Sequence, residues 1–204
     1  MDVIKTLAEA LDNNKPARSV EGLNDEQNQF AKSLTLLSAK PVLYICNVMD
    51  PGDTENELVL KVKEIAKQDK STVVALAGKL EGEIMEMEDP EEQKIFMEEM
   101  GLTETGLDRM IAAGYGLLEL STYFTAGEKE VRAWTIPEKA KAPQAAGVIH
   151  TDFEKGFIRA EVYNLEDLVQ HKTESAIKDA GKLRVEGKDY MVQDGDIMHF
   201  RFNV

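Results

Sequence analysis

The chain of 204 residues is long enough for one large domain or two small ones, and its 43% hydrophobic and 30% charged residues are typical of a globular protein. Its net charge of −14 excludes a general basic surface for nucleic acid, so RNA binding would need a local patch and DNA sequence recognition is not expected. There is no run of 18 apolar residues and no basic-then-apolar N-terminus, which predicts neither a membrane span nor a secretory signal.

The first 38 residues show two helical patterns. Apolar residues recur at helical spacing over residues 2–12, and the Asn, Lys and Pro residues at 13–16 end that helix. A second helix is expected from about residue 25 to 37, with Asn24 or Asp25 as its N-cap. The two predict a helical hairpin, which needs a further partner because it would bury little apolar surface alone.

A strand–helix–strand pattern follows. The apolar runs at 41–46 and 72–76 are typical of buried parallel strands, and a helix is expected between them at about 55–67. Such a βαβ unit with a right-handed crossover belongs to a parallel sheet. Two strands do not form a stable sheet alone, so further strands are expected elsewhere in the protein.

Two more helices are predicted before the character of the sequence changes. The first covers residues 89–100, where Asp89 is a suitable N-cap and Pro90 a suitable first residue, and Gly101 ends it. The second covers about 103–118. Four apolar residues of this second helix are expected to face inward: Leu107, Met110, Ile111 and Leu118.

From about residue 120 the pattern becomes rich in short strands. A hairpin is predicted from 121–125 and 131–136, with a turn at Gly127. The remaining expected elements are a helix at about 145–153, a strand at 157–163, a helix at 174–180, and strands at 188–192 and 197–203. This order, strand-rich with a crossing helix, is typical of a β-grasp domain that begins near 117–120.

One local pattern suggests ligand binding. Asn47-Val48-Met49-Asp50 follows the first parallel strand, and in P-loop proteins an Asn-x-x-acid motif at this place reads a purine base. The next strand ends in Ala77-Gly78-Lys79, which is similar to the second base-side loop of such proteins. The alternative interpretation is a plain Asx-turn at 47–50, because this spacing is common in turns.

The motifs that hold phosphates and metal do not occur in these 204 residues. There is no Gly-x-x-x-x-Gly-Lys-Ser/Thr, and Asp194-Gly195-Asp196 is interpreted as turn chemistry rather than a Mg²⁺ ligand. The three histidines are widely spaced, so neither a catalytic cluster nor a metal site is predicted. Cys46 is interpreted as a small core residue, and a single cysteine fits a reducing cytoplasm.

Longer strings give the chain a specific resemblance. They are KPAR at 15–18, AKPVLY at 39–44, GY at 114–115, YFTAG at 123–127, KEVRAWTI at 129–136, APQAAG at 142–147, IHTDFEKGFIRA at 149–160 and EGKDY at 186–190. The chain thereby resembles the YchF family of Obg-like ATPases over nearly its whole length.

The resemblance implies three parts. Residues 1–38 would be the end of a helical, coiled-coil-like insertion, residues 39–116 the second half of a P-loop nucleotide-binding domain, and residues 117–204 a TGS domain of β-grasp fold. The family's P-loop and Mg²⁺ site would precede this chain, so it is expected to be a fragment. The intact protein would bind ATP or GTP with Mg²⁺ and hydrolyse ATP slowly in the cytoplasm, whereas the fragment is expected to be inactive and to hold no nucleotide tightly.

Nucleotide preference is open because the family usually has Glu where this chain has Asp50. The shorter carboxylate is nearer the guanine-reading form, but Val48 and Met49 do not restore Asn-Lys-x-Asp. ATP is favoured because the neighbouring residues follow the family.

The resemblance also implies docking to the ribosome, ribosomal RNA or a protein through the TGS part. That part carries 12 basic and 15 acidic residues, against 12 and 23 in residues 1–116. Arg132, Lys155 and Arg159 are the candidate contacts with a phosphate backbone, together with Trp134, whose alternative role is core packing. The rival hypothesis is a non-catalytic interaction module, in which residues 39–116 only support the docking surface.

Overall fold

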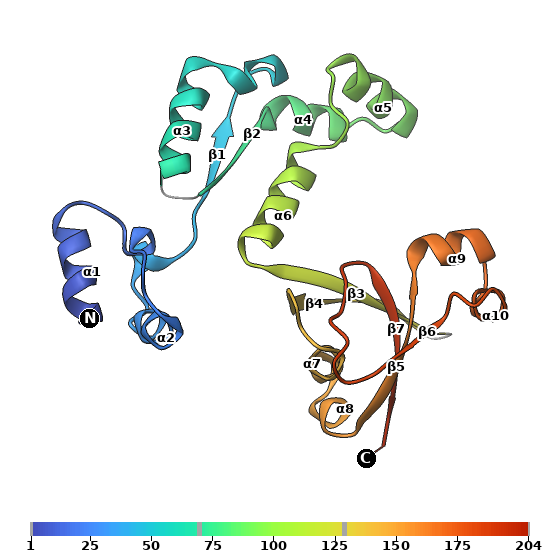
Figure 1. Cartoon of the computed structure of the whole chain (residues 1–204). Helices are drawn as coiled ribbons and strands as arrows, with labels where there is room; N and C mark the ends of the chain where they lie inside the picture. The colour runs from blue at the N-terminus through green and yellow to red at the C-terminus, as the bar shows by residue number, and fades with distance from the viewer. Residues whose placement is uncertain (1, 69–70, 128–129, 204) are drawn as a thin grey trace. The chain divides into compact units, whose positions relative to one another are not determined.

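The computed structural model describes residues 2–68, 71–127 and 130–203 (Figure 1). The chain divides into two compact units, Met1–Leu118 and Glu119–Val204. The division into three parts at 38 and 116 remains a prediction. No helix among the described residues is long and apolar enough to cross a bilayer.

The first unit begins with two short helices, as predicted. They are α1 (Val3–Asp12) and α2 (Asp25–Ser33), with 3-10 turns η1 (Ala17–Ser19) and η2 (Leu37–Ala39) between and after them. Asn24 is the N-cap of α2 and forms a capping box with Gln27. α2 ends four residues earlier than predicted, because the chain turns through a left-handed Thr35 (φ 51°). Leu37 consequently lies outside the helix and is exposed.

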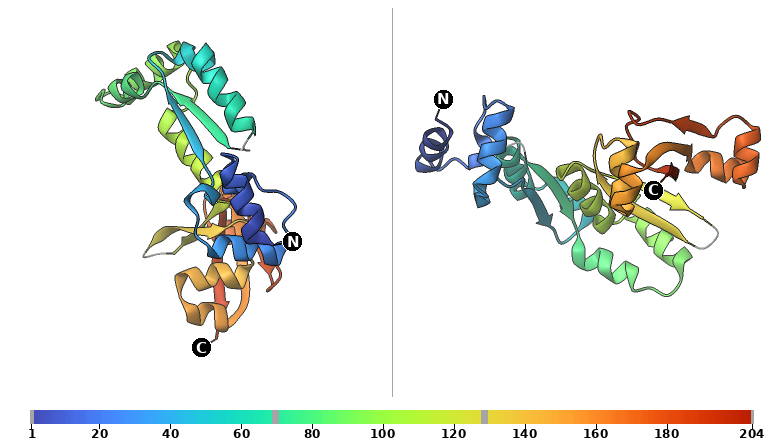
Figure 2. Two further views of the ribbon diagram at one scale, coloured as in Figure 1. Left: turned by 90° about the vertical axis from the view of Figure 1, so that its left-hand side faces the viewer. Right: turned by 90° about the horizontal axis from the view of Figure 1, so that it is seen from below.

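The predicted βαβ unit is present. Strands β1 (Leu43–Asn47) and β2 (Thr72–Leu76) pair in parallel, with η3 (Pro51–Glu55) and α3 (Glu57–Gln68) between them. α3 and α6 lie on opposite sides of this pair (Figure 2). The expectation that β1 is buried is wrong: Ile45 is 48% exposed. β1 pairs only with β2 among the described residues, so much of its surface has no cover.

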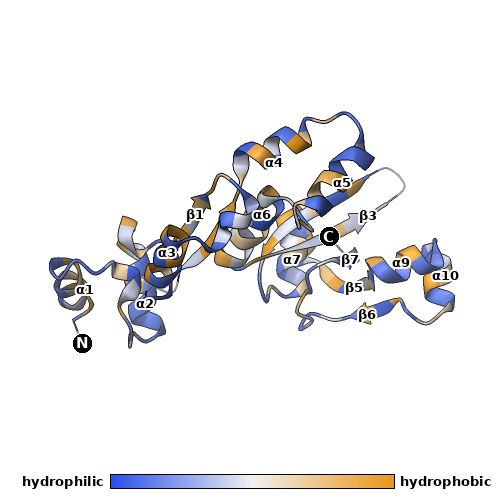
Figure 3. Cartoon of the chain, turned by 90° about the horizontal axis from the view of Figure 1, so that it is seen from above, coloured by the Kyte–Doolittle hydropathy of each residue, from blue (hydrophilic) through white to orange (hydrophobic). Residues whose placement is uncertain are grey.

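Three helices complete this unit: α4 (Gly78–Met85), α5 (Pro90–Glu99) and α6 (Gly106–Leu117). The N-cap at Asp89 is confirmed, whereas α6 starts later than predicted because Thr105 is its N-cap. The predicted inward face of α6 is wrong: Leu107, Ile111 and Leu118 are exposed, and only Met110 is half-buried. A two-stranded sheet is too narrow to cover this face, and hydrophobic segments are visible along α4, α5 and α6 (Figure 3).

The second unit is a five-stranded mixed sheet in the order β4-β3-β7-β5-β6. Its strands are β3 (Leu120–Ala126), β4 (Val131–Pro137), β5 (Phe157–Asn164), β6 (Arg184–Glu186) and β7 (Asp196–Phe202). β3 and β7 are parallel, and the other neighbours are antiparallel. The predicted hairpin is therefore present, as are the strands expected at 157–163 and 197–203.

The helices of this unit differ from the prediction. They are α7 (Ala142–Ile149), α8 (Thr151–Lys155), α9 (Leu165–His171) and α10 (Glu174–Asp179). The helix predicted at 145–153 is two helices, because His150 is extended and caps α8 through Nδ1, which accepts the Asp152 N–H. α9 was not predicted. The expected strand at 188–192 is wrong: only Met191 forms a bridge there, and β6 lies earlier in the chain.

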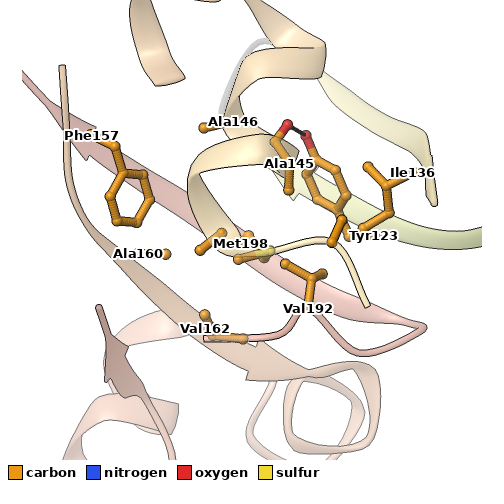
Figure 4. Close-up of a cluster of buried hydrophobic side chains, with 11 residues drawn as sticks. Tyr123, Ile136, Ala145, Ala146, Phe157, Ala160, Val162, Val192 and Met198 are labelled. Carbon is orange, nitrogen blue, oxygen red and sulfur yellow. Dashed lines mark hydrogen bonds between the residues drawn. The ribbon is translucent and has the colours of Figure 1, made fainter. Parts of the chain in front are cut away.

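The sheet is covered on both faces (Figure 1). α7 and α8 cover one face, over a core that includes Tyr123, Val162 and Met198 (Figure 4). The Tyr123 hydroxyl donates to the Ala145 carbonyl at 2.9 Å, which fixes α7 on β3. The opposite face carries a smaller cluster around Tyr163 and Ile177, under α9 and α10.

Candidate functional site

The two sequence segments predicted to form a base site lie side by side. Asn47 and Leu76 are partners at the carboxyl ends of the parallel strands β1 and β2, and the Val48 N–H donates to the Leu76 carbonyl at 2.9 Å. Directly beyond them, Asn47 Oδ1 accepts the Gly78 N–H at 3.1 Å. One side chain therefore joins the two segments at the sheet edge where α/β proteins place ligands.

Glycine at position 78 leaves room for this contact. A Cβ there would lie 3.1 Å from Leu76 Cδ1 and 3.3 Å from Asn47 Oδ1, closer than most real Cβ contacts. Gly78 is also the first residue of α4, so the loop expected at 77–79 is in fact the start of a helix. Its N-cap is Ala77, which has no capping side chain, so the usual signal of a helix start is missing here.

Asp50 forms an Asx-turn, the alternative interpretation of residues 47–50. Its Oδ1 accepts the Gly52 N–H at 2.8 Å and caps η3. The preceding residue, Met49, is 86% exposed, and in the second segment the Lys79 side chain is exposed beside Glu83. Capping uses one carboxylate oxygen, so a turn residue here can still offer the other oxygen to a ligand.

Sequence inspection missed the group that holds the second segment in place. Glu81, one turn into α4, is buried, and its Oε1 accepts the Ala77 N–H at 3.0 Å. The N–H groups of Ala77 and Gly78 therefore both donate to protein side chains. A glutamate one turn after a strand end that contains glycine can indicate a helix start. The partners of Glu81, Gly106 and Arg109, are too distant in sequence to predict.

The three cations proposed for docking do not share one face. Arg132 lies 4.1 Å above the Trp134 ring, and this ring is half-buried against the α7 side of the sheet, as in the core-packing alternative. Lys155 ends α8. Arg159 points from the opposite side of β5 and pairs with Glu161 at 3.8 Å.

Glu161 lies between two guanidinium groups. Arg201 Nη2 donates to Glu161 Oε2 at 2.9 Å, and Arg159 approaches the other oxygen. The hydrogen bond from Arg201, followed by the charges around it, lowers the pKa of Glu161 below its usual value. Glu174 also contributes negative charge near Arg201, so two carboxylates balance the two guanidinium groups here.

The Asp194-Gly195-Asp196 segment serves the fold, as interpreted. Gly195 has φ 81°, and Asp194 Oδ1 accepts the Thr122 N–H at 2.7 Å. Asp196 is 1% exposed and accepts from Tyr190, the Gln193 N–H and Arg184 at 2.7, 2.9 and 3.1 Å. Burial, and then the hydrogen bond to Asp196, raise the pKa of Tyr190 to about 12.

Within the described ranges, no group of three or more His, Cys, Asp or Glu side chains is placed to hold a metal ion. Cys46 is only half-buried, so it is not the fully buried core residue that its strand suggested.

Comparisons with known proteins identify the relatives of this chain. A family model named YchF-GTPase_C, described as "Protein of unknown function (DUF933)", matches residues 120–203. The chain is 50% identical over 208 residues to the ribosome-binding ATPase YchF of Bacillus subtilis and 52% identical over 204 residues to that of Haemophilus influenzae. Each alignment covers 100% of this chain and 56% of the relative. The chain thus spans about half the length of the curated relatives it matches.

A solved structure shows the same similarity. The YchF GTPase of Schizosaccharomyces pombe superposes with a TM-score of 0.81 at 36% identity, over 98% of this chain and 53% of that protein. The mixed α/β fold described above is therefore shared with it.

Proposed function

Because this chain belongs to the YchF and Obg-like ATPase family, we propose that it carries the base-contacting part of a P-loop ATPase or GTPase site. The residues concerned are Asn47, Val48, Met49, Asp50, Ala77, Gly78 and Lys79. The observation that supports this proposal is the hydrogen bond from Gly78 to Asn47, which brings both segments to the carboxyl edge of the sheet. ATP, with Mg²⁺, is the favoured nucleotide of a protein that also contains the phosphate-binding motifs.

Base contacts alone give weak binding, because most nucleotide affinity comes from groups around the phosphates. We therefore propose that the chain by itself does not hydrolyse nucleotide. We expect no heat in a calorimetric titration with Mg-ATP or Mg-GTP, but NMR shifts at the amides of 47–50 and 77–79, with a Kd of about 1 mM or weaker, which is about −4 kcal/mol.

The variant Asp50→Asn tests whether this carboxylate contacts the base. Asn keeps the turn but loses the charge, so the base-dependent NMR shifts should weaken and the preference between ATP and GTP should change. Asp53→Asn, in the same 3-10 turn, is the matched control and should leave the titration unchanged. Equal titrations for both variants, or shifts that avoid these segments, would refute the base site.

A second candidate function is docking to the ribosome, and the relatives named as ribosome-binding favour it. We propose that residues 117–204 form a TGS domain of β-grasp type and that the protein acts in the cytoplasm. Lys155 and Arg159 are proposed as contacts with ribosomal RNA from different faces of the sheet, so each is tested by itself. Arg132 is a weaker candidate because its guanidinium lies over Trp134. A protein partner would use the same unit in the non-catalytic alternative.

Ribosome co-sedimentation across a salt series tests this docking surface. Arg159→Ala and Lys155→Ala should each weaken binding and reduce the slope of log affinity against log salt by about 1, because each removes one phosphate contact. Lys188→Ala, an exposed lysine of the same unit, is the control. An unchanged slope in both test variants would assign docking to other residues.

A further inference from the structure

Glu81 is a buried acidic side chain in the first unit, with 8% of its surface exposed. A carboxylate in such a place is costly unless it is paired and hydrogen-bonded. Since it lies next to the proposed base site but has little access to solvent, its partners indicate what it does.

Three groups converge on this carboxylate, one from the junction of β2 and α4 and two from α6. Oε1 accepts the Ala77 N–H at 3.0 Å and lies 3.4 Å from Arg109 Nη2, and Oε2 accepts the N–H of Gly106, the first residue of α6. Arg109 also donates through Nη1 to the Ala75 carbonyl of β2 at 3.0 Å. The carboxylate thus joins the end of β2, the start of α4 and the start of α6.

Gly106 permits this close approach. A Cβ at Gly106 would lie 2.6 Å from Leu76 Cβ and 2.7 and 2.9 Å from the two Glu81 oxygens. Any other residue would therefore displace either the carboxylate or α6, so Glu81 and Gly106 act as a matched pair.

The arrangement leads directly to the proposed base site. Ala77, held by Glu81, is followed by Gly78, held by Asn47 Oδ1. Side chains from α4 and β1 accept these two successive N–H groups. They thereby determine the position of residues 77–79 relative to Asn47 and Asp50.

We propose that Glu81, supported by Arg109, is a positioning residue that fixes the Ala77–Gly78 backbone in the geometry that distinguishes one purine base from another. This inference rests on the proposed function of the site. Glu81 itself contacts no base; it acts by preventing the segment from shifting.

The test compares base discrimination in the full chain and its variants by NMR titration with adenosine and guanosine nucleotides. Glu81→Gln keeps the shape but weakens its hydrogen bonds, so hydrogen exchange at the Ala77 and Gly78 amides should rise at least tenfold and the ratio of ATP to GTP affinity should move toward 1. Arg109→Lys should give a smaller change in the same direction, and it serves if the first variant unfolds. Glu83→Gln, exposed on the same helix, is the control.

The possible outcomes distinguish failure of this inference from failure of the proposed base site. If the unmodified chain binds neither nucleotide at these amides, the proposed function fails and the inference with it. If it binds both with unequal affinity and Glu81→Gln keeps the same ratio, Glu81 is only structural and the inference alone is overturned. Binding of inorganic triphosphate, which has no base, should be equal in all variants.

Discussion

Replacing Asp196 by alanine is expected to lower the free energy of unfolding of the second unit by about 3 kcal/mol, because a buried carboxylate that accepts three hydrogen bonds is lost. The side chain is almost fully buried and satisfies three donors, from Tyr190, Gln193 and Arg184. Its loss leaves the Tyr190 hydroxyl and the Gln193 N–H without this acceptor, whereas Arg184, 40% exposed, keeps its contact with Asn164. The connection between β6 and β7 should therefore loosen first.

Urea denaturation followed by Trp134 fluorescence measures this effect, because Trp134 is the single tryptophan and packs against the core of this unit. Asp196→Asn, which retains one acceptor oxygen, should lose less. Asp189→Ala is the control, since that exposed carboxylate pairs only with Lys141 among the described residues. The pKa of Tyr190 should also fall in the Asp196 variants but stay above its usual value of 10, because burial is its larger cause. If Asp189→Ala were as damaging as Asp196→Ala, the central role of Asp196 would be wrong.

Much of the fold follows from local pattern. The apolar runs at 41–46 and 72–76 form parallel strands, and Asp89-Pro90 starts a helix, because these signals depend on neighbours in sequence. The pairing of Asn47 with Gly78 was also foreseeable, since the carboxyl ends of adjacent parallel strands meet at one sheet edge.

What local pattern could not supply depends on distant residues. The start of α4 at Gly78 is stabilised by Glu81, whose own partners, Gly106 and Arg109, lie more than twenty residues further on. The apolar stripe of α6 is visible in the sequence, but periodicity does not reveal the width of the sheet against which the helix packs. This sheet has two strands among the described residues, and Leu107 stays exposed. Likewise Arg132 and Arg159 look alike in sequence, and only strand register places them on opposite faces.

Gly106→Ala is the substitution expected to affect the first unit most, with a loss of about 3 kcal/mol in the free energy of unfolding. The cause is steric, because the new Cβ would overlap Leu76 and the Glu81 carboxylate. Either α6 shifts away from β2, or Glu81 moves and leaves its charge buried without its partners. Movement of Glu81 releases Ala77, so this response should also weaken nucleotide shifts at 77–79.

Gly114→Ala provides a closely matched control, because it lies in the same helix and its Cβ would meet nothing within 4 Å. Alanine is the better helix former by about 1 kcal/mol, so this variant should be more stable than the original chain. Hydrogen exchange at the Ala77 amide follows the first unit, and Trp134 fluorescence should show the second unit unchanged. Far-UV circular dichroism during denaturation reports the two units together. If Gly106→Ala matched Gly114→Ala in stability, the close contact between α6 and Glu81 would not hold this unit together, and fixing of the Ala77–Gly78 segment would have to come from Asn47 alone.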